Sequence, residues 1–153
     1  MADPVSDAID DLQSKMETVS AIRNRAIYVY DQEDLLNTEK QIKTPCAGVL
    51  YVGMAINEED TRREKAVLLT AQVAFIGGDF CELPNSQVKE KTTKILDDIR
   101  RAVIAPPTSA TQLVWRFESE APFEINRQGG DKLIGYVQSW TTPIIINETA
   151  PYQ

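Results

Sequence analysis

The sequence predicts an α+β domain in which a mainly antiparallel, twisted sheet is built around one long central hairpin and accompanied by two helices. Two β-like segments, residues 47–56 and 65–76, read AGVLYVGMAI and KAVLLTAQVAFI on either side of the charged segment NEEDTRRE. Successive strand residues point to opposite faces of a sheet, and both segments carry apolar side chains on both faces. Because only two other segments have strong helical periodicity, we expect copies of the chain to cover part of this sheet.

The first predicted helix covers residues 4–20. Asp3 and Pro4 are typical of a helix start, where a capping side chain is followed by proline at the first helical position. Carboxylates are favourable near this end of a helix, and we expect Asp10 and Asp11 to extend an acidic outer face. The apolar side chains recur at helical spacing: Val5, Ala8, Ile9, Leu12, Met16 and Val19.

A short strand, residues 26–30, is predicted before the hairpin. The polar segment that follows, residues 31–44, has no clear periodicity, and its length is typical of functional or disordered loops. We expect it to form a flexible loop. The first hairpin strand would extend over roughly 33 Å at about 3.3 Å per residue, which is long for a small domain. It is therefore expected to bend at Gly53 or to project beyond the core.

The second half of the chain predicts one helix and two further strands. An apolar stripe along residues 86–103 indicates the helix, which a pair of prolines ends. Alternating apolar residues predict strands over residues 113–125 and 133–142. Residues 143–153 begin with proline and are expected to form an extended tail. The chain has no internal repeat or linker, so we expect residues 1–153 to form a single domain.

Composition excludes several classes of function. The net charge of −7 disfavours nonspecific binding to nucleic acids or to anionic membranes, since both are polyanions. No segment approaches the roughly 18 consecutive apolar residues that span a bilayer. The first residues are acidic, whereas a secretory signal would begin with basic and then apolar residues. We therefore expect a cytosolic product.

The residues that support enzyme or metal chemistry are few. The chain has no histidine, which excludes Ser-His and Cys-His nucleophilic catalysis, and its two cysteines, Cys46 and Cys81, belong to no zinc motif. We expect both to be partly buried thiols. The carboxylates of NEEDTRRE lack the spacing of a calcium loop. An acid–base pair among Glu118, Glu120 and Glu124 is an alternative to their lying on the polar side of an edge strand. We expect no metal, no cofactor and no enzyme activity.

Taken together, these segments resemble the tail terminator (tail completion) proteins of long-tailed bacteriophages. The resemblance covers nearly the whole chain and lies in the order and texture of DAIDDLQSKM, AIYVY, AGVLYVGMAI with KAVLLTAQVAFI, VKEKTTKILDDIRRAV and LIGYVQSWTTPIII. It implies α+β subunits that assemble as a ring, commonly a hexamer. Such a ring caps the completed tail tube, stops its polymerisation and provides the surface that joins the head. It implies a structural virion protein of the tail or neck, assembled in the host cytoplasm.

The resemblance also implies partners. They are the tail tube protein, neck or connector proteins, and the sheath or its cap if the tail is contractile. DNA would only pass through the lumen of the ring. The negative charge of the subunits could line this lumen, where it would repel DNA and prevent it from binding. We expect no membrane partner.

A ring requires two different surface patches that meet around a closed rotation. We assign Val49, Tyr51, Leu69 and Phe75 to one patch and Trp140, Ile144 and Ile146 to the other, with packing in the subunit's own core as the alternative for each. The tail strand is also expected to add to an exposed sheet edge of a neighbour. The hairpin tip is expected to face the tube or the neck through Glu58, Glu59, Asp60, Arg62 and Arg63.

Two other functions remain open at this point. Another head–tail connector, such as a neck or stopper protein, would share the composition and ring symmetry but contact different partners. A small-ligand or regulatory binding module of the α+β class would instead be a monomer or dimer with an enclosed pocket.

Overall fold

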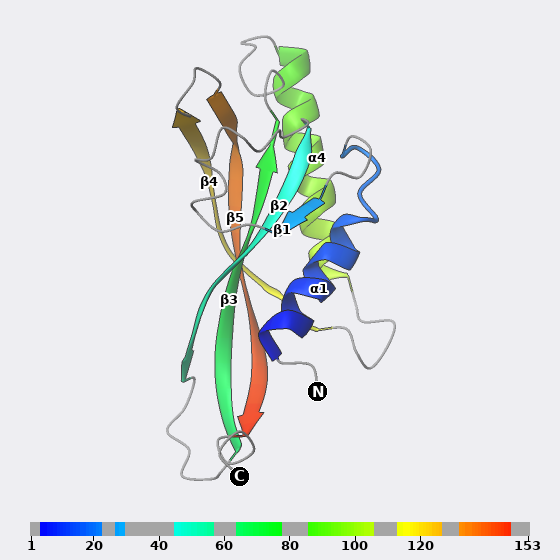
Figure 1. Ribbon diagram of the computed structural model, residues 1–153. Coiled ribbons are helices and arrows are strands. Elements are labelled where there is room, and N and C mark those ends of the chain that lie inside the picture. The colour runs from blue at the N-terminus through cyan, green and yellow to red at the C-terminus, as the bar shows by residue number, and fades with distance from the viewer. Residues whose placement is uncertain are drawn as a thin grey trace.

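The predicted order of helices and strands is present in the protein. The computed structural model describes residues 4–22, 27–29, 45–56, 64–77, 86–105, 113–126 and 132–147. The elements are α1 (Pro4–Met16), β1 (Ile27–Val29), β2 (Cys46–Ile56), β3 (Glu64–Ile76), α4 (Ser86–Ile104), β4 (Arg116–Asn126) and β5 (Lys132–Asn147). Figure 1 shows their arrangement, which confirms the α+β class. The expected loop at residues 31–44 lies outside the described residues.

The sheet has five strands in the order β1-β2-β3-β5-β4. The predicted hairpin is confirmed, with β2 and β3 antiparallel from the pair Cys46↔Ile76 to the pair Ile56↔Val67. β5 pairs antiparallel with β3 and with β4, and only β1 is parallel to its neighbour. The β2–β3 register shifts between Tyr51 and Gly53, where the bend was expected. This bulge adds one residue, Val52, to β2, and a bulge strengthens the local twist of a strand.

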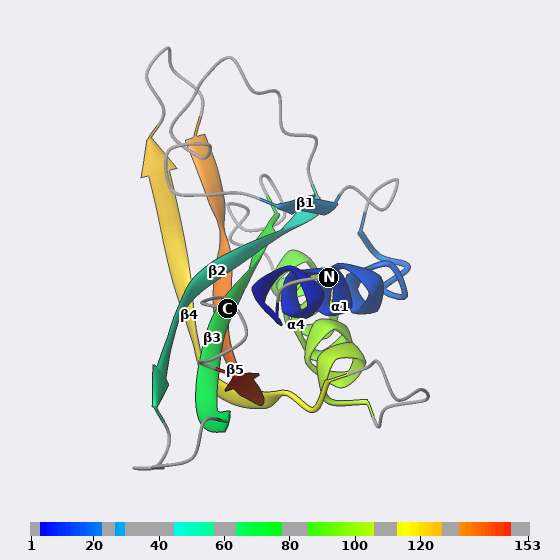
Figure 2. The same ribbon diagram turned by 60° about the horizontal axis from the view of Figure 1, so that its bottom comes forward.

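Both helices lie on the same face of the sheet, as the turned view in Figure 2 shows. They bury this face in the main hydrophobic core, to which α1 contributes Leu12 and Met16, and α4 contributes Ile99 and Val103. The strands supply the opposite wall of this core with Val49, Leu69, Val73, Phe75 and Trp140. Every second residue of a strand points to the same face, so this layer accounts for half of the apolar residues in the hairpin.

The opposite face of the sheet carries the other half of the apolar pattern. A smaller buried cluster there contains Cys46, Ala74, Ile76 and Leu133. Among the described residues, no helix lies on this face. The expectation that the hairpin has apolar side chains on both faces is therefore confirmed for the described part of the chain.

The last strand is longer than expected and corrects the predicted tail. Residues 143–147 do not leave the sheet but continue β5, where Pro143 pairs with Leu68 of β3. Proline has no N–H to donate, so a strand accepts it where a partner strand is missing on one side. This condition is met because the pairing of β4 with β5 ends at Thr141. The remaining residues, 148–153, lie outside the described part.

Past the end of the β4–β5 pairing, three strands continue as a narrow ribbon, whose first residues still belong to the main hydrophobic core. We call residues 51–56 of β2, 64–71 of β3 and 142–147 of β5 the ribbon. Its strands remain paired through Ala55↔Leu68 on one side of β3 and Leu68↔Pro143 on the other. Figure 1 shows that the sheet twists strongly and that the ribbon extends past α1. The expected projection of the hairpin beyond the core is confirmed.

Two glycines provide a matched test of this packing. A Cβ added to Gly135 of β5 would lie 1.8 Å from the backbone oxygen of Phe75, whereas one added to Gly53 would have no neighbour within 4 Å. We predict that Gly135→Ala lowers the free energy of unfolding by about 3 kcal/mol, because the two strands must move apart. Gly53→Ala should change it by less than about 0.5 kcal/mol. Urea unfolding of dilute protein measures both, and equal effects would contradict the close approach at Gly135.

Candidate functional site

The first part of the candidate site is an unpaired edge along β2. β1 pairs with β2 only from Ala47 to Val49. Among the described residues, no strand pairs with the outer side of residues 50–56, which we call the open β2 edge. Two apolar side chains on it reach solvent, since Val52 is 52% exposed and Met54 is 38% exposed.

The second part is an unpaired edge along β5, on the opposite side of the ribbon. β4 pairs with β5 from Asn126↔Lys132 to Arg116↔Thr141 and no further. Within the described part of the chain, residues 142–147 therefore have a strand partner on the β3 side alone, and we call them the open β5 edge. Ile145 on this edge is 67% exposed. Neither open edge contains Lys, Arg, Asp or Glu, the residues that commonly protect exposed edges from pairing.

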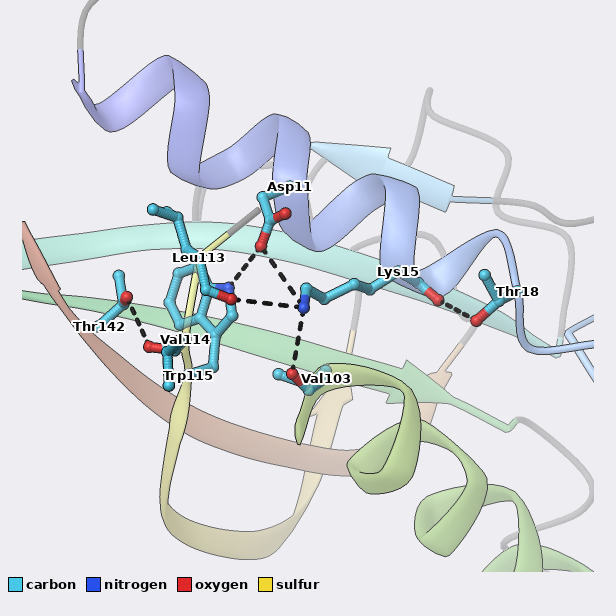
Figure 3. A network of polar contacts seen from close by, with 8 residues as sticks. All are labelled: Asp11, Lys15, Thr18, Val103, Leu113, Val114, Trp115 and Thr142. Atoms are coloured by element: carbon cyan, nitrogen blue, oxygen red, sulfur yellow. Dashed lines mark hydrogen bonds and ion pairs between the residues drawn. The ribbon is translucent and has the colours of Figure 1, made fainter. Parts of the chain in front are cut away.

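A buried hydrogen bond explains why β4 leaves β5 at this point. Trp115 Nε1 donates to Asp11 Oδ2 of α1 at 2.7 Å, and both side chains are buried. Residues 113–115 consequently lie against the helices instead of continuing the ladder along β5 (Figure 3). Thr142 Oγ1 donates to the backbone oxygen of Val114 at 2.7 Å and fixes this segment across the helix-bearing face. The open β5 edge is thus a consequence of the contact between Asp11 and Trp115.

Lys15 joins the same buried cluster. Its Nζ lies 3.9 Å from Asp11 Oδ2 and donates to the backbone oxygens of Val103 at 3.4 Å and Leu113 at 3.5 Å. Val103 is in the last turn of α4, where carbonyl groups lack helical partners and a cation is favourable. Figure 3 shows Lys15 between α1, the end of α4 and the start of β4. We call Asp11, Lys15 and Trp115 the latch, because they join these three elements.

The latch corrects one expectation. Asp11 was expected on the acidic outer face of the first helix, yet it is buried, while Asp10 is exposed. The signal in the sequence is the spacing of Asp11 and Lys15, which places both beside the apolar stripe at Leu12 and Met16. An isolated sequence offers no indication that Trp115, over a hundred residues away, is the partner.

A second buried polar network attaches α4 to the sheet. Gln138 of β5 donates to the backbone oxygen of Leu96 at 3.2 Å and to Glu120 Oε1 at 2.9 Å, and it accepts a hydrogen bond from Trp140 Nε1 at 3.2 Å. Arg100 of α4 also donates to Glu120. Because the buried amide has partners for its nitrogen and its oxygen, this network stabilises the sheet–helix packing without an unsatisfied group.

The structure places most of the residues assigned to the subunit interface inside the chain. Val49, Leu69, Phe75 and Trp140 are between 0% and 1% exposed in the main core, so their side chains are not available to a neighbour. The core alternative holds for these four because they point to the helix-bearing face. Tyr51 and Ile144 pack against the same core and are partly buried. The side chain of Ile146 lies outside the described part.

The remaining candidate residues do not come together. The hairpin-tip residues Glu58, Glu59, Asp60, Arg62 and Arg63 lie outside the described residues. Glu118 accepts a hydrogen bond from Thr141 Oγ1 at 2.8 Å, whereas Glu120 accepts from Gln138 and Arg100. A register shift between Phe117 and Ser119 places these two carboxylates on opposite faces of β4. The expectation that both lie on one polar side is therefore wrong, and they form no acid–base pair.

The described residues contain one open hollow of about 310 Å³ between β4 and β5, lined by Pro122, Phe123, Glu124, Ile134, Gly135 and Tyr136. Its lining has one carboxylate and one phenol, which is less than the converging polar groups of a specific ligand site. In the part of the chain that is described, no three acidic or thiol side chains gather as a metal site would require. No described helix is long and apolar enough to cross a membrane.

The single described thiol, Cys46, is fully buried and free. Burial raises its pKa from 9.0 to about 12, because an apolar environment disfavours the thiolate. Cys46 is therefore inert at neutral pH. Cys81 lies outside the described residues.

Neither a scan of protein-family models nor a search of curated proteins finds a match to this sequence.

The latch predicts a non-additive pair of substitutions. Lys15→Met leaves the Asp11 carboxylate buried without its cation and should lower the free energy of unfolding by about 3 kcal/mol. Adding Asp11→Asn removes the uncompensated charge and still accepts a hydrogen bond from Trp115, so the double variant should recover part of the loss. Lys94→Met, at an exposed position of α4, is the matched control and should cost less than about 0.5 kcal/mol. Strict additivity of the two latch substitutions in urea unfolding would show that the groups do not interact.

Proposed function

We propose that this protein is a structural subunit that assembles with copies of itself into a ring, and that the ring caps the tail tube of a long-tailed bacteriophage. The observation that carries the proposal is the pair of open edges on the ribbon, both uncharged and both with exposed apolar side chains. Exposed strand edges of this kind are templates for pairing with another chain. A protein that retains two of them is suited to repeated assembly.

The roles of the buried polar groups in the described part of the chain support a structural function over a catalytic one. Among the described residues, the buried polar groups serve the latch and the Gln138 network, and each of these holds helices to the sheet. The hollow between β4 and β5 is open and poor in converging polar groups. These observations favour assembly over a small-ligand module.

The role at the tail tube follows from the resemblance in the sequence. A tail terminator ring stops the growth of the tube by occupying its end, and it presents a different surface to the head. The functional partners proposed here are accordingly the tube protein on one side of the ring and neck proteins on the other. A stopper or another neck component would form a similar ring but would not bind the end of a purified tube.

We predict that the protein has a solution mass that is a multiple of 17.1 kDa, most simply six, either alone at high concentration or when tail tubes are added. Light scattering after size exclusion and co-sedimentation with purified tubes measure this. A species that stays monomeric in both experiments would contradict the proposed function. A ring that ignores the tube but binds neck proteins would move the assignment to a neck component.

The open edges provide variants for the same experiment. Met54→Lys and Ile145→Lys place a charge on each edge, and together they should reduce the mass to that of the monomer, because a charged side chain disfavours strand addition. Ile104→Lys is the matched control, since Ile104 is also apolar and 55% exposed but lies at the end of α4 and belongs to neither open edge. Assembly that survives the double substitution would exclude the edges as the contact.

A further inference from the structure

The directions of the strands limit how the open edges of two copies can meet. The inference below rests on the proposed function, in which copies of the chain form a ring. β2 is antiparallel to β3, and β3 is antiparallel to β5, so the two outer strands of the ribbon run in the same direction. Their open edges are also similar in length, since residues 50–56 face outward on one side and residues 142–147 on the other. One chain therefore carries both halves of a possible strand junction.

We infer that the open β5 edge of one copy pairs in parallel with the open β2 edge of the next copy, so that the ribbons form one continuous sheet around the ring. A rotation axis roughly along the strands keeps all copies in the same direction, and it brings β5 of each copy beside β2 of its neighbour. Such a junction joins two different surfaces, as a closed ring requires. When the ribbons close into a ring, both the open β2 edge and the open β5 edge are paired, while the outer sides of β1 and β4 take no part in the junction.

The main competing arrangement is a two-fold dimer, in which the β2 edges of two copies pair with each other. Two-fold symmetry makes identical strands antiparallel, and this arrangement would leave both β5 edges unpaired with Ile145 exposed. The parallel junction instead pairs the open β2 edge and the open β5 edge with each other, with Met54 on the helix-bearing face and Ile145 on the helix-free face. The one edge-protecting residue present, Pro143, removes a single donor and leaves the rest of the β5 edge able to pair.

The closed sheet also assigns a face to the channel. The helices lie on one face of every copy, and their bulk places that face on the outside of the ring. The helix-free face then lines the channel, where the ribbon presents Ala55, Thr70 and Ile145. Six ribbons supply roughly 18 strands, a number at which barrels enclose an open channel.

The net negative charge of the chain suggested an acidic channel, but the strands that line the channel in this arrangement are largely uncharged. Residues 45–56, 67–76 and 133–145 contain no Asp, Glu, Lys or Arg, so the three central strands carry no charge over these ranges. A wall that is uncharged over these ranges neither holds nor repels a polyanion strongly. This property suits passage of DNA without binding.

Cysteine cross-linking tests the parallel junction. Ala55 and Ile145 are both exposed. Both also point to the helix-free face: Ala55 pairs with Leu68, Leu68 pairs with Pro143, and Ile145 is two residues beyond Pro143 on β5. Neighbouring strands are about 4.8 Å apart, within the Cα separation that a disulfide spans. We would introduce Ala55→Cys and Ile145→Cys in a Cys81→Ser background, where the buried Cys46 is unreactive.

The expected result is a series of cross-linked species of increasing mass on a non-reducing gel. Under mild oxidation, the variant with both cysteines should give dimers, trimers and larger species up to the size of the ring. Each single-cysteine variant should stay monomeric on a non-reducing gel, and a mixture of the two should give dimers only. Ala55→Cys with Pro143→Cys provides a second pair, since Pro143 is exposed and lies level with Ala55 through their shared neighbour Leu68.

Two outcomes would overturn the inference. Dimers from Ala55→Cys alone would indicate the two-fold junction of β2 edges. No cross-link from either cysteine pair, in protein whose native mass is that of a ring, would show that the ring forms through other surfaces and would leave the proposed function intact. If the native mass is that of a monomer even with tail tubes, the proposed function itself fails.

Discussion

The hydrogen bond between Trp115 and Asp11 is the contact on which the shape of the sheet depends. It directs residues 113–115 onto the helices, so that β4 reaches β5 only at Thr141 and, among the described residues, no strand pairs with the last part of β5 on that side. A fully paired β4 would cover the open β5 edge. A buried polar contact in the core of the subunit thus determines which backbone groups remain at its surface.

Some apolar side chains of the sheet are buried within the subunit, and others remain exposed on its surface. The helices cover one face of the sheet with Leu12, Met16, Ile99 and Val103, and this layer is complete within a single chain. Exposed apolar side chains of the sheet occur at both open edges, at Val52 and Met54 on one and at Ile145 on the other, as well as at Phe117 of β4. We therefore place the assembly contacts at the edges of the ribbon and not on the helix-bearing face. At these edges, neighbouring copies can form backbone hydrogen bonds between strands as well as apolar contacts.

Much of the fold could be predicted from local patterns. Helical periodicity indicated α1 and α4, and the two long apolar runs indicated the hairpin, because these signals depend on neighbours in the sequence. The end of β5 was missed because Pro143 usually ends a strand, and only the missing β4 partner explains its place within one.

The candidate site was harder to predict than the fold. Val49, Leu69, Phe75 and Trp140 were assigned to the interface because each is apolar, but alternation along a strand does not reveal which face the helices cover. Asp11 was placed outside because a carboxylate in a helix usually faces solvent. Its burial depends on Trp115, a contact between residues distant in sequence. Likewise, an open edge is a property of strand pairing and has no signature in the sequence.

Amide hydrogen exchange tests the central claim most directly, by comparing dilute monomeric protein with the assembled form. If the edges carry the assembly, peptides that cover residues 50–56 and 142–147 should both exchange more slowly in the assembled protein, while peptides from the core of α4 should change little. Slower exchange at only one of the two edges, or at neither, would contradict the account.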